Sequence, residues 1–438
     1  MPTRRQFLGD SSRLALAASI GTLLPLGAQS RTAPSDKVRI ALVGCGGMGM
    51  GDLENHLKQP GVVCAGLCDV DQKRLESAAA RVEKMNGQKP TLYKDFRKLL
   101  ENKDIDAVII GTPDHWHCLI MVMACQAGKD VYVEKPMANS IAECEVMVKA
   151  ARRYGRVVQV GQQQRSGKNW QEIVAFVQSG KLGKIRQVRL FGHFDYGMGA
   201  PRIENSTPPS ELDYELWLGP APFSPYNANR LHGVWRHQWH YGGGLLSDWG
   251  VHLLDIPLWA MKVEGAPQWV NAAGGIFVYP ERQIETADTL NVSYAFEDWT
   301  LTWEHIGGSQ TGLYNRNYGM AFIGANGTLV ANREGWELLP VMRDNKYIME
   351  ALPPQKSAES NHEAHAINFL ECIKSRKDPA CTVEMGYLAA FYAHMGNISY
   401  RSGTRLKWDA SRQNFGENKA ANALITPEYR APWELPKL

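Results

Sequence analysis

The chain has 438 residues, of which 44% are hydrophobic and 21% are charged. This length suits two or three domains with sizeable cores, and the composition excludes a globally disordered protein. The formal net charge of +3 falls to +1 without residues 1–30, which hold three arginines and one aspartate, so charge does not support binding to nucleic acid or to an anionic membrane.

The first thirty residues predict an export signal outside the fold. Thr3-Arg4-Arg5-Gln6-Phe7-Leu8 is a twin-arginine pattern, and it precedes a modestly apolar segment, 14–26, and a small-residue site at 28–30. An ordinary secretory signal and a cytoplasmic basic tail are the alternatives. We expect export to the periplasm by the twin-arginine route, which carries folded proteins with cofactors already bound. No later run of eighteen or more apolar residues occurs, so we expect no membrane span in the mature chain.

A strand followed by a glycine-rich turn comes next. An apolar, β-branched run over residues 38–43 is typical of a buried parallel strand, and it ends in a Gly-x-Gly-x-x-Gly motif. In a dinucleotide fold the first glycine permits a tight turn, the second lets the backbone approach a pyrophosphate, and the third lets the next helix pack closely. A purely structural turn is the alternative. The pattern predicts a phosphate cradle made of Gly44, Gly46, Gly47, Met48 and Gly49.

A second apolar run, residues 62–68, ends in Asp69, twenty residues after Gly49. An acidic residue at this place holds the ribose hydroxyls of NAD and repels the 2′-phosphate of NADP. The sequence therefore favours NAD as the cofactor. Lys73 and Arg74 follow closely and weaken that preference, so NADP stays open.

Strands and helices alternate from residue 37 to residue 160, which predicts a parallel sheet with helices on both faces. The expected strands also include residues 107–110, 130–133 and 157–160, and the expected helices are 75–85, 96–100, 117–127 and 141–154.

The pattern changes after residue 160. A helix over 170–179 and a strand over 185–194 precede a long loop rich in Pro, Gly, Ser and Asn over 196–230. Gly242-Gly243-Gly244 then opens a helix that runs to Trp259. Short strands at 290–296, 299–305 and 320–323 predict an open antiparallel or mixed sheet, and two helices follow at 362–375 and 384–402.

Four motifs in order carry a family resemblance. The chain resembles the glucose–fructose oxidoreductase and inositol dehydrogenase (Gfo/Idh/MocA) family over roughly residues 37–255, and residues 208–222 resemble a bacterial exported subgroup. After residue 260 no family motif is matched, and only the general pattern of short strands and helices is similar. The motifs are the glycine cradle, Thr112-Pro113-x-x-x-His117, Gly128-Lys129-x-Val131-x-x-Glu134-Lys135-Pro136 and Gly242-Gly243-Gly244-x-x-x-Asp248-x-x-x-His252.

These patterns together predict an α/β fold of several parts. An N-terminal Rossmann dinucleotide-binding domain is expected, followed by an α+β domain with a large open, mostly antiparallel sheet for substrate and oligomerisation. The resemblance implies a homo-oligomer, a dimer or tetramer, that pairs through this sheet. The expected boundaries are 1–30 for the signal, 37–160 for the Rossmann domain, 161–360 for the sheet domain, 361–402 for helices packing back on the core, and 403–438 for a C-terminal arm.

Lys135 is the first candidate catalytic residue. It follows a predicted parallel strand, where open α/β sheets bind ligands, and it could donate a hydrogen bond to a substrate hydroxyl. Partial burial is expected to lower its pKa. By resemblance, Lys135 polarises the reacting hydroxyl or carbonyl, and Glu134 also lines the nicotinamide. The alternative is an exposed surface lysine.

Asp248 and His252 are the second candidate pair. Four residues apart on a predicted helix, they would share one face, where the carboxylate could orient the imidazole for accepting a hydroxyl proton. By resemblance, His252 is the proton acceptor and Asp248 holds substrate hydroxyls or the histidine itself. A helix-surface pair or a core histidine is the alternative.

Other polar and aromatic residues extend the predicted site. By resemblance, Thr112, Pro113, His115 and His117 face the cofactor, although capping and packing are as well supported. Gln162 and Arg165 follow the last strand of the first domain and could bind the nicotinamide ribose or the substrate. Arg236 and Trp239 lie in an aromatic run, residues 235–241, that could bind a sugar or pack in the core.

Metal and disulfide chemistry find little support. His237 and His240 have no carboxylate or third histidine at a useful spacing, and none of the eight cysteines lies in a zinc pattern, so we expect no metal. We interpret the cysteines as small buried hydrophobes, with disulfides as the alternative.

The leading functional hypothesis is an NAD(P)-dependent oxidoreductase that transfers a hydride between nicotinamide and a carbinol carbon of a sugar, polyol or glycoside. Lys135, Asp248 and His252 would carry the chemistry, with a small carbohydrate as substrate and NAD as cofactor. A glycosidase that keeps its NAD bound and oxidises the sugar only transiently is the second hypothesis, because some exported relatives work that way. A non-catalytic sugar sensor that retains the nucleotide fold is the third.

Overall fold

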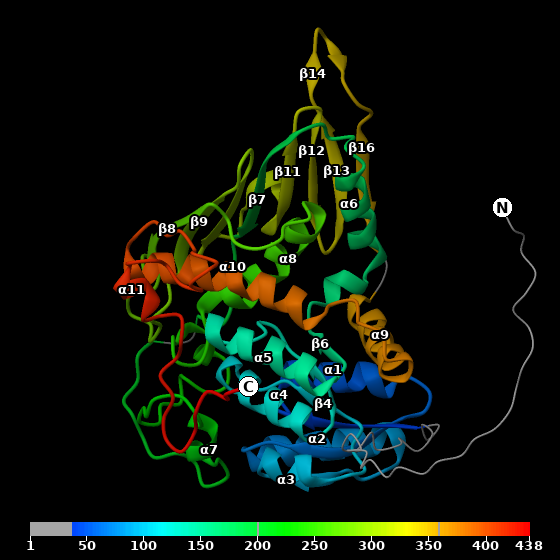
Figure 1. Ribbon diagram of the computed structural model, residues 1–438, viewed down its shortest axis with the longest axis vertical. Coiled ribbons are helices and arrows are strands. Elements are labelled where there is room, and N and C mark those ends of the chain that lie inside the picture. The colour runs from blue at the N-terminus through cyan, green and yellow to red at the C-terminus, as the bar shows by residue number, and fades with distance from the viewer. Residues whose placement is uncertain (1–36, 199–200, 358–359) are drawn as a thin grey trace, which may run out of the picture. The chain divides into compact units, whose positions relative to one another are not determined.

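The computed structural model of the protein describes residues 37–198, 201–357 and 360–438 (Figure 1). The expected export signal lies outside these residues. The described residues form one unit built on two large sheets, one of six strands and one of eight, with a two-stranded hairpin beyond the second. Parallel strands make up the first sheet, and the second is mixed and mostly antiparallel, so the predicted α/β fold class is confirmed.

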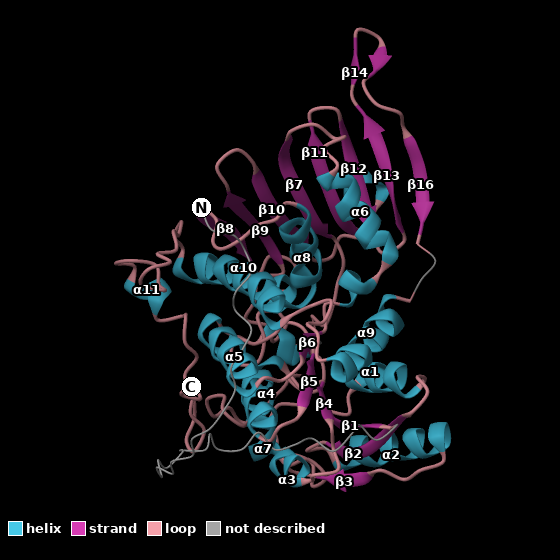
Figure 2. Cartoon of the chain, turned by 45° about the vertical axis from the view of Figure 1, so that its right-hand side comes forward, coloured by secondary structure: helices cyan, strands magenta, loops and turns pink. Residues whose placement is uncertain are grey.

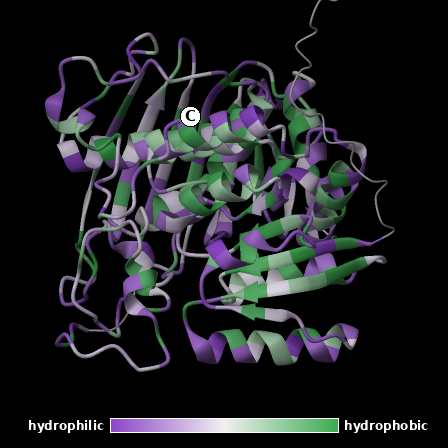
Figure 3. Ribbon diagram, turned by 60° about the horizontal axis from the view of Figure 1, so that its bottom comes forward, coloured by the Kyte–Doolittle hydropathy of each residue, from purple (hydrophilic) through white to green (hydrophobic). Residues whose placement is uncertain are grey.

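The parallel sheet has the strand order β3-β2-β1-β4-β5-β6. Its inner strands are mainly apolar and buried because helices cover both faces, whereas the edge strand β3 is largely exposed; Figure 3 shows the strands mostly in the green of hydrophobic residues. The strand order reverses between β1 and β4, and such sheets bind ligands at the carboxyl ends of the strands at this point. The strands are β1 Val38–Val43, β2 Val62–Cys68, β3 Thr91–Tyr93, β4 Ala107–Ile110, β5 Asp130–Val133 and β6 Val158–Val160.

Side chains of the parallel strands alternate between two cores. Ala41 and Val43 pack on one side of β1, toward α3 (Phe96–Glu101), α4 (His117–Gln126) and α5 (Ile141–Tyr154). Ile40 and Leu42 pack on the other side, toward α1 (Gly47–Leu57), α2 (Gln72–Asn86) and α9 (Asn361–Ser375), which joins from far along the chain (Figure 2).

The eight-stranded sheet is centred on β7, which pairs parallel with β10 and antiparallel with β11. Helices α6 (Lys168–Gln178), α8 (Val251–Ala260) and α10 (Val383–Ser402) pack on it and enclose the largest core (Figure 1). The strand order is β16-β13-β12-β11-β7-β10-β9-β8. Its strands are β7 Ile185–Gly192, β8 Trp269–Gly275, β9 Thr289–Ala295, β10 Thr300–Ile306, β11 Tyr318–Gly324, β12 Gly327–Asn332, β13 Gly335–Pro340 and β16 Leu352–Lys356, and the hairpin is β14 Met342–Arg343 and β15 Lys346–Tyr347.

The helices of the second half are α6 Lys168–Gln178, α7 Tyr214–Leu218, α8 Val251–Ala260, α10 Val383–Ser402 and α11 Lys419–Asn422. The helix predicted to follow Gly244 is not uniform: a π-helical turn, Leu246–Gly250, precedes α8. Helix α10 packs on both α8 and α5, so it joins the sheet domain to the Rossmann domain. No helix among the described residues is long and apolar enough to cross a membrane.

The C-terminal arm ends against the Rossmann domain. The Trp433 ring lies 5.0 Å from the Trp116 ring and 6.4 Å from the Phe96 ring, between centroids. The Tyr429 hydroxyl donates to Glu143 Oε1 at 2.7 Å, and Ser140 Oγ donates to Glu143 Oε2 at 2.9 Å. The arm therefore closes over the start of α5 and leaves Glu143 1% exposed by residue surface.

Burial of Glu143 makes stability depend on pH. It raises the pKa of this carboxyl to about 7, although the Tyr429 and Ser140 hydrogen bonds oppose the rise. Because the folded pKa exceeds the unfolded one, the contribution to stability is complete below the unfolded pKa and is lost as pH rises toward 7. We expect wild type to lose about 3 kcal/mol relative to Glu143→Gln across that window.

Melting temperatures of the two proteins between pH 4.5 and 7.5 test this. Glu83→Gln, on the exposed side of α2, is the matched control and should follow wild type at every pH. Parallel curves for wild type and Glu143→Gln would contradict the expectation.

The eight cysteines are all buried free thiols, as the interpretation as small hydrophobes requires.

Candidate active site

The glycine motif forms a closely packed cradle at the end of β1. Gly44 has φ +91°, and a Cβ atom there would lie 2.6 Å from the carbonyl carbon of Gly111. A Cβ on Gly49 would collide with the carbonyl oxygen of Gly44, so α1 packs against the turn only with glycine at this position. No side chain caps the start of α1 at Gly46, and the free N–H groups there suit a phosphate.

Replacing Gly49 with alanine is expected to push α1 away from the cradle and to lower NAD affinity by about tenfold or more, because the clash is with backbone and cannot relax cheaply. Titration calorimetry of the cofactor-stripped protein with NAD measures the effect. Gly51→Ala is the matched control on the same helix, since an added Cβ there meets nothing within 4 Å. Equal losses in the two variants would refute the role of Gly49.

Asp69 stabilises the cradle through its carboxylate. The N–H of Cys45 donates to Oδ2 at 2.7 Å, and the N–H of Asp71 donates to Oδ1 at 2.9 Å. The residue also lines the cavity above the cradle, so the remaining lone pairs can accept ribose hydroxyls. Arg74 lines this cavity as well, whereas Lys73 pairs with Glu211 outside it.

The cavity extends from the cradle to the sheet domain. One end holds Gly44, Gly46, Gly47, Met48 and Asp69, and the middle holds Thr112 and Pro113. Thr112 Oγ1 is buried and has no hydrogen-bond partner among the described residues, as expected where a ligand supplies one. The other end holds Glu134, Lys135, Trp235, Arg236 and Asp248.

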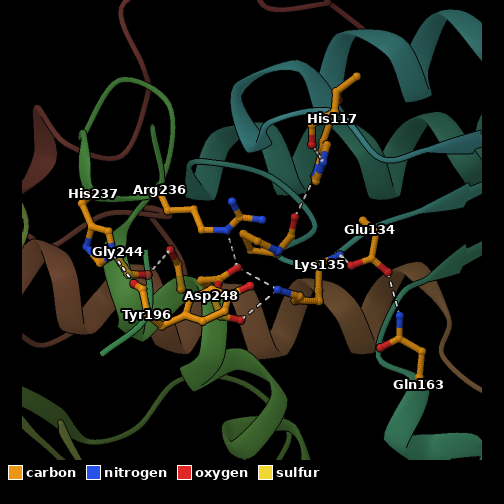
Figure 4. Close-up of polar contacts among 12 residues, drawn as sticks. His117, Glu134, Lys135, Gln163, Tyr196, Arg236, His237, Gly244 and Asp248 are labelled. Carbon is orange, nitrogen blue, oxygen red and sulfur yellow. Dashed lines mark hydrogen bonds and ion pairs between the residues drawn. The ribbon is translucent and has the colours of Figure 1, made fainter. Parts of the chain in front are cut away.

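Lys135 and Asp248 form a buried ion pair at this far end (Figure 4). Lys135 Nζ lies 2.8 Å from Asp248 Oδ1 and donates to the Asp248 carbonyl oxygen at 3.2 Å. Arg236 Nε lies 3.3 Å from the same Oδ1. Two elements more than a hundred residues apart thus meet here: the end of β5 and the π-helical turn before α8.

The pKa of Lys135 differs from the expectation. Burial acts to lower it, as predicted, but the Asp248 and Glu134 carboxylates outweigh burial, so the net pKa is raised. Burial likewise acts to raise the pKa of Asp248, and Lys135 and Arg236 reverse it, so that pKa is lowered. Lys135 is therefore a cationic donor at neutral pH and not a neutral amine.

His252 lies near this pair without bonding to it, and its side chain does not itself line the cofactor cavity. Its ring centroid is 6.2 Å from that of Trp249, its Nδ1 is buried, and neither ring nitrogen has a hydrogen-bond partner among the described residues. Burial, with the charges of Lys135 and Arg333, holds its pKa well below 6.5, so the ring is neutral and can accept a proton. The expected Asp248–His252 hydrogen bond is not formed, because Asp248 is directed toward Lys135 and Arg236.

Glu134 lines the cavity beside Lys135 and is itself buried. Its Oε1 accepts from Gln163 Nε2 at 2.7 Å, and its Oε2 accepts from the Lys135 N–H at 3.3 Å. Burial raises its pKa, and it shares its surroundings with the buried carboxyl of Asp52. Gln162, the expected cofactor ligand, is buried beside Gln163 but does not line the cavity, and its Oε1 has no partner among the described residues.

The side chains of two predicted cofactor residues lie against backbone carbonyl groups instead. His117 bridges two strand ends, with Nε2 2.9 Å from the Thr112 carbonyl oxygen and Nδ1 2.9 Å from that of Pro136. His115 Nε2 lies 3.0 Å from the carbonyl oxygen of Trp217. Neither histidine lines the cofactor cavity, so the structure supports the packing alternative for both.

Two predicted substrate residues are also engaged elsewhere. Arg165 makes a buried bidentate ion pair with Asp255, with Nη2 2.7 Å from Oδ1, and it therefore ties the end of β6 to α8. Trp239 lies under the Arg401 guanidinium, 4.7 Å from ring centroid to Cζ, in a different hollow. Only Arg236 of the predicted peripheral substrate residues reaches the cavity.

Models of one protein family match nearly the whole described chain. The model described as an oxidoreductase family NAD-binding Rossmann fold matches residues 38–162. Its C-terminal α/β domain model matches 166–275 and 341–435, and a second C-terminal domain model matches 222–330. The chain belongs to the Gfo/Idh/MocA oxidoreductase family. Its Rossmann domain is an NAD-binding domain.

Two kinds of curated relatives match. A protein of Shewanella sp. (strain W3-18-1) named "Glycosyl hydrolase family 109 protein" is 28% identical over 209 residues, 47% of this chain and 40% of that protein. The match thus spans less than half of that relative's length. YrbE of Bacillus subtilis (strain 168), named an uncharacterized oxidoreductase, is 22% identical over 366 residues, 83% of this chain and 94% of that protein.

Solved structures show the same fold. A levoglucosan dehydrogenase in complex with NADH and levoglucosan has a TM-score of 0.64 at 19% identity, covering 85% of this chain and 99% of that one. An aldose–aldose oxidoreductase from Caulobacter crescentus, complexed with glycerol, has a TM-score of 0.64 at 21% identity, with 85% and 99% covered.

The folded chain adds residues that the sequence did not indicate. Asp114 is buried in the cavity wall, and burial together with the Asp248 charge raises its pKa well above its ordinary value. Asp114 directly follows the Thr112-Pro113 strand end, where α/β sheets bind ligands, so its position in the sequence could have identified it as a site residue. Arg333, in the turn between β12 and β13, has no neighbouring sequence motif and could not have been found this way.

Proposed function

We propose that this protein is an NAD-dependent oxidoreductase that acts on a carbinol carbon of a sugar, polyol or glycoside. The supporting observation is the buried Lys135–Asp248 ion pair, which lines the far end of the NAD cavity. The charge of Lys135 acts on the neutral ring of His252 nearby. A cation and a proton acceptor at one place are what the oxidation of a hydroxyl group requires.

The cavity residues fit NAD. The glycine cradle and the start of α1 would hold the pyrophosphate, with Arg74 beside it: Arg74 Nη1 lies 2.9 Å from where a Gly46 Cβ would be. Asp69 would hold the adenosine ribose, and Glu134 the nicotinamide side. When bound, NAD supplies the acceptor for a hydride.

The chain's own residues supply the acid–base chemistry. His252 takes the proton of the substrate hydroxyl, because its imidazole is neutral and its nitrogens have no partner among the described residues. Lys135 donates a hydrogen bond to the same oxygen as negative charge develops on it. Asp248 and Arg236 position the ammonium of Lys135, and Asp248 Oδ2, buried without a partner among the described residues, can accept a second substrate hydroxyl.

A second candidate function is a glycosidase that keeps its NAD. The segment 208–236 favours it, because that segment bridges the two walls of the cofactor cavity. On one side the Gln72 N–H donates to the Glu211 carbonyl at 3.0 Å, and on the other Trp116 Nε1 donates to the Trp217 carbonyl at 3.1 Å. Leu216, Trp217, His232, Trp235 and Arg236 of this segment line the cavity.

We infer that this bridge slows the release of NAD, which suits a cofactor that stays bound through a redox cycle with no net oxidation. The Shewanella relatives with a glycosyl hydrolase name point in the same direction.

One experiment separates these functions. The purified protein is denatured, and released NAD is measured; then free sugars, polyols and glycosides are offered without added cofactor. Reduction of bound nicotinamide by a sugar or polyol supports the oxidoreductase. Release of the aglycone with no net reduction supports the glycosidase. Bound NAD that reacts with none of them would overturn both and favour the sensor.

We further propose twin-arginine export and a homo-oligomer that pairs through the eight-stranded sheet. The Arg4-Arg5 pattern supports the first, and the partly exposed alternate residues of β10, Thr300, Thr302 and Glu304, support the second. Cell fractionation of a double variant in which Arg4 and Arg5 are both replaced by lysine tests the export route, and light scattering of the mature protein tests the oligomer.

A further inference from the structure

Arg333 lies beside Trp249, close enough to His252 for its charge to act there but outside the lining of the cofactor cavity, and it forms no ion pair with a described residue. It lies in the turn between β12 and β13, with its Cζ 4.6 Å from the centroid of the Trp249 ring. No ion pair or side-chain hydrogen bond joins it to any described residue. Burial lowers its pKa although the charges of Asp248 and Glu134 act to raise it, so this guanidinium is held partly out of water with no direct ion pair in the described part of the chain.

Arg333 lies close to the residues that we propose react with the substrate. Trp249, which it covers, contacts the His252 ring at 6.2 Å and the Tyr318 ring at 5.3 Å, between centroids. The charge of Arg333 contributes to the low pKa of both His252 and His362, so these groups share one space.

Positive charge exceeds negative charge in this space. Lys135 and Arg236 both bind Oδ1 of Asp248, so one carboxylate serves two cations, and Arg333 adds a third. Glu134 and Asp114 lie nearby, but burial raises the pKa of both carboxyls, and Glu134 is bonded to Gln163. The site as it stands is suited to a ligand that brings an anion.

Two further atoms call for a ligand with hydroxyl groups. Asp248 Oδ2 and His252 Nδ1 are buried without partners among the described residues, in side chains of residues that are 4% and 7% exposed. Each can accept a hydrogen bond. One molecule that carries both hydroxyls and an anionic group would satisfy all three residues.

We propose that the substrate is a sugar acid, whose carboxylate is bound by Arg333 while its hydroxyls face Asp248 and His252. Trp249 covers one face of the guanidinium, which leaves its edge for a planar, singly charged group, and a carboxylate matches that edge in shape and charge. This inference rests on the proposed function, because it names the substrate class of the same site.

Binding to the NAD-loaded protein tests the proposal by calorimetry. The probes are two matched pairs, glucuronate against glucose and galacturonate against galactose, with glucose 6-phosphate as a third arm. We expect at least one uronate to bind about tenfold or more tightly than its hexose. In Arg333→Gln that advantage should disappear while hexose binding stays the same. Arg343→Gln, an exposed arginine in β14, should behave as wild type.

Each outcome decides a different point. Uronate binding that depends on Arg333 without nicotinamide reduction would support this inference and refute the proposed oxidation. Turnover of neutral sugars with no uronate preference, or equal losses for hexose and uronate in Arg333→Gln, would overturn the inference and leave the oxidation standing. Preference for the phosphorylated sugar would overturn the carboxylate. Melting temperature and NAD content confirm that each variant is folded.

Discussion

Replacing Lys135 with methionine is expected to lower kcat by about 10³-fold while NAD stays bound, because the substrate oxygen loses its one ammonium donor as charge develops on it. The side chain is buried and paired with Asp248, whereas the other lysine that lines the cavity, Lys94, follows β3 at the Asp69 end. Arg236 still neutralises Asp248 in the variant, so we expect the protein to fold.

Single-turnover absorbance of bound nicotinamide measures the loss, and NAD release after denaturation shows that cofactor binding is intact. Lys84→Met, in the last turn of α2, is the exposed control and should keep wild-type activity. Unchanged turnover in Lys135→Met would remove Lys135 from the mechanism.

Replacing His252 with glutamine is expected to lower kcat by about 10²- to 10⁴-fold, the range of lost general-base catalysis. Glutamine keeps polar atoms at the site but cannot take a proton at neutral pH. His240→Gln, an exposed histidine outside the cofactor cavity, is the control and should match wild type.

The pH profile gives an independent readout. His252 must be neutral to act, and its pKa lies well below 6.5 because of burial and of the charges of Lys135, Arg333 and His362 around it. Wild-type kcat is therefore level near neutral pH and falls only as the pH drops through that lowered pKa. This acidic limb should vanish in His252→Gln. A limb that persists there would assign it to another group.

The sequence predicted the fold well where the signal is local. Apolar runs ending in glycines or in Glu134-Lys135 marked β1, β4 and β5, and helical periodicity located α2, α5, α9 and α10 close to their observed bounds. The strands between residues 331 and 360 carried no clear alternation and were not predicted individually. The π-helical turn at Leu246–Gly250 was missed, since no local pattern separates it from an α-helix.

The candidate site was predicted less completely. His115, His117 and Arg165 have residue types suited to binding ligands, but each is used by the fold. A histidine between two backbone carbonyls and a histidine beside a cofactor look alike in a linear sequence. Their difference arises only from which partner the folded chain brings to the ring nitrogens.

The amino-acid sequence by itself therefore determines the α/β class, the phosphate cradle and the position of Lys135 at a strand end. These features depend on neighbouring residues and on the spacing of apolar side chains along the chain. Pairing depends on contacts across the fold: Lys135 meets Asp248 from 113 residues away, and Arg165 meets Asp255 from 90. Charge state follows from that pairing and from burial, which is why the pKa of Lys135 is raised and not lowered.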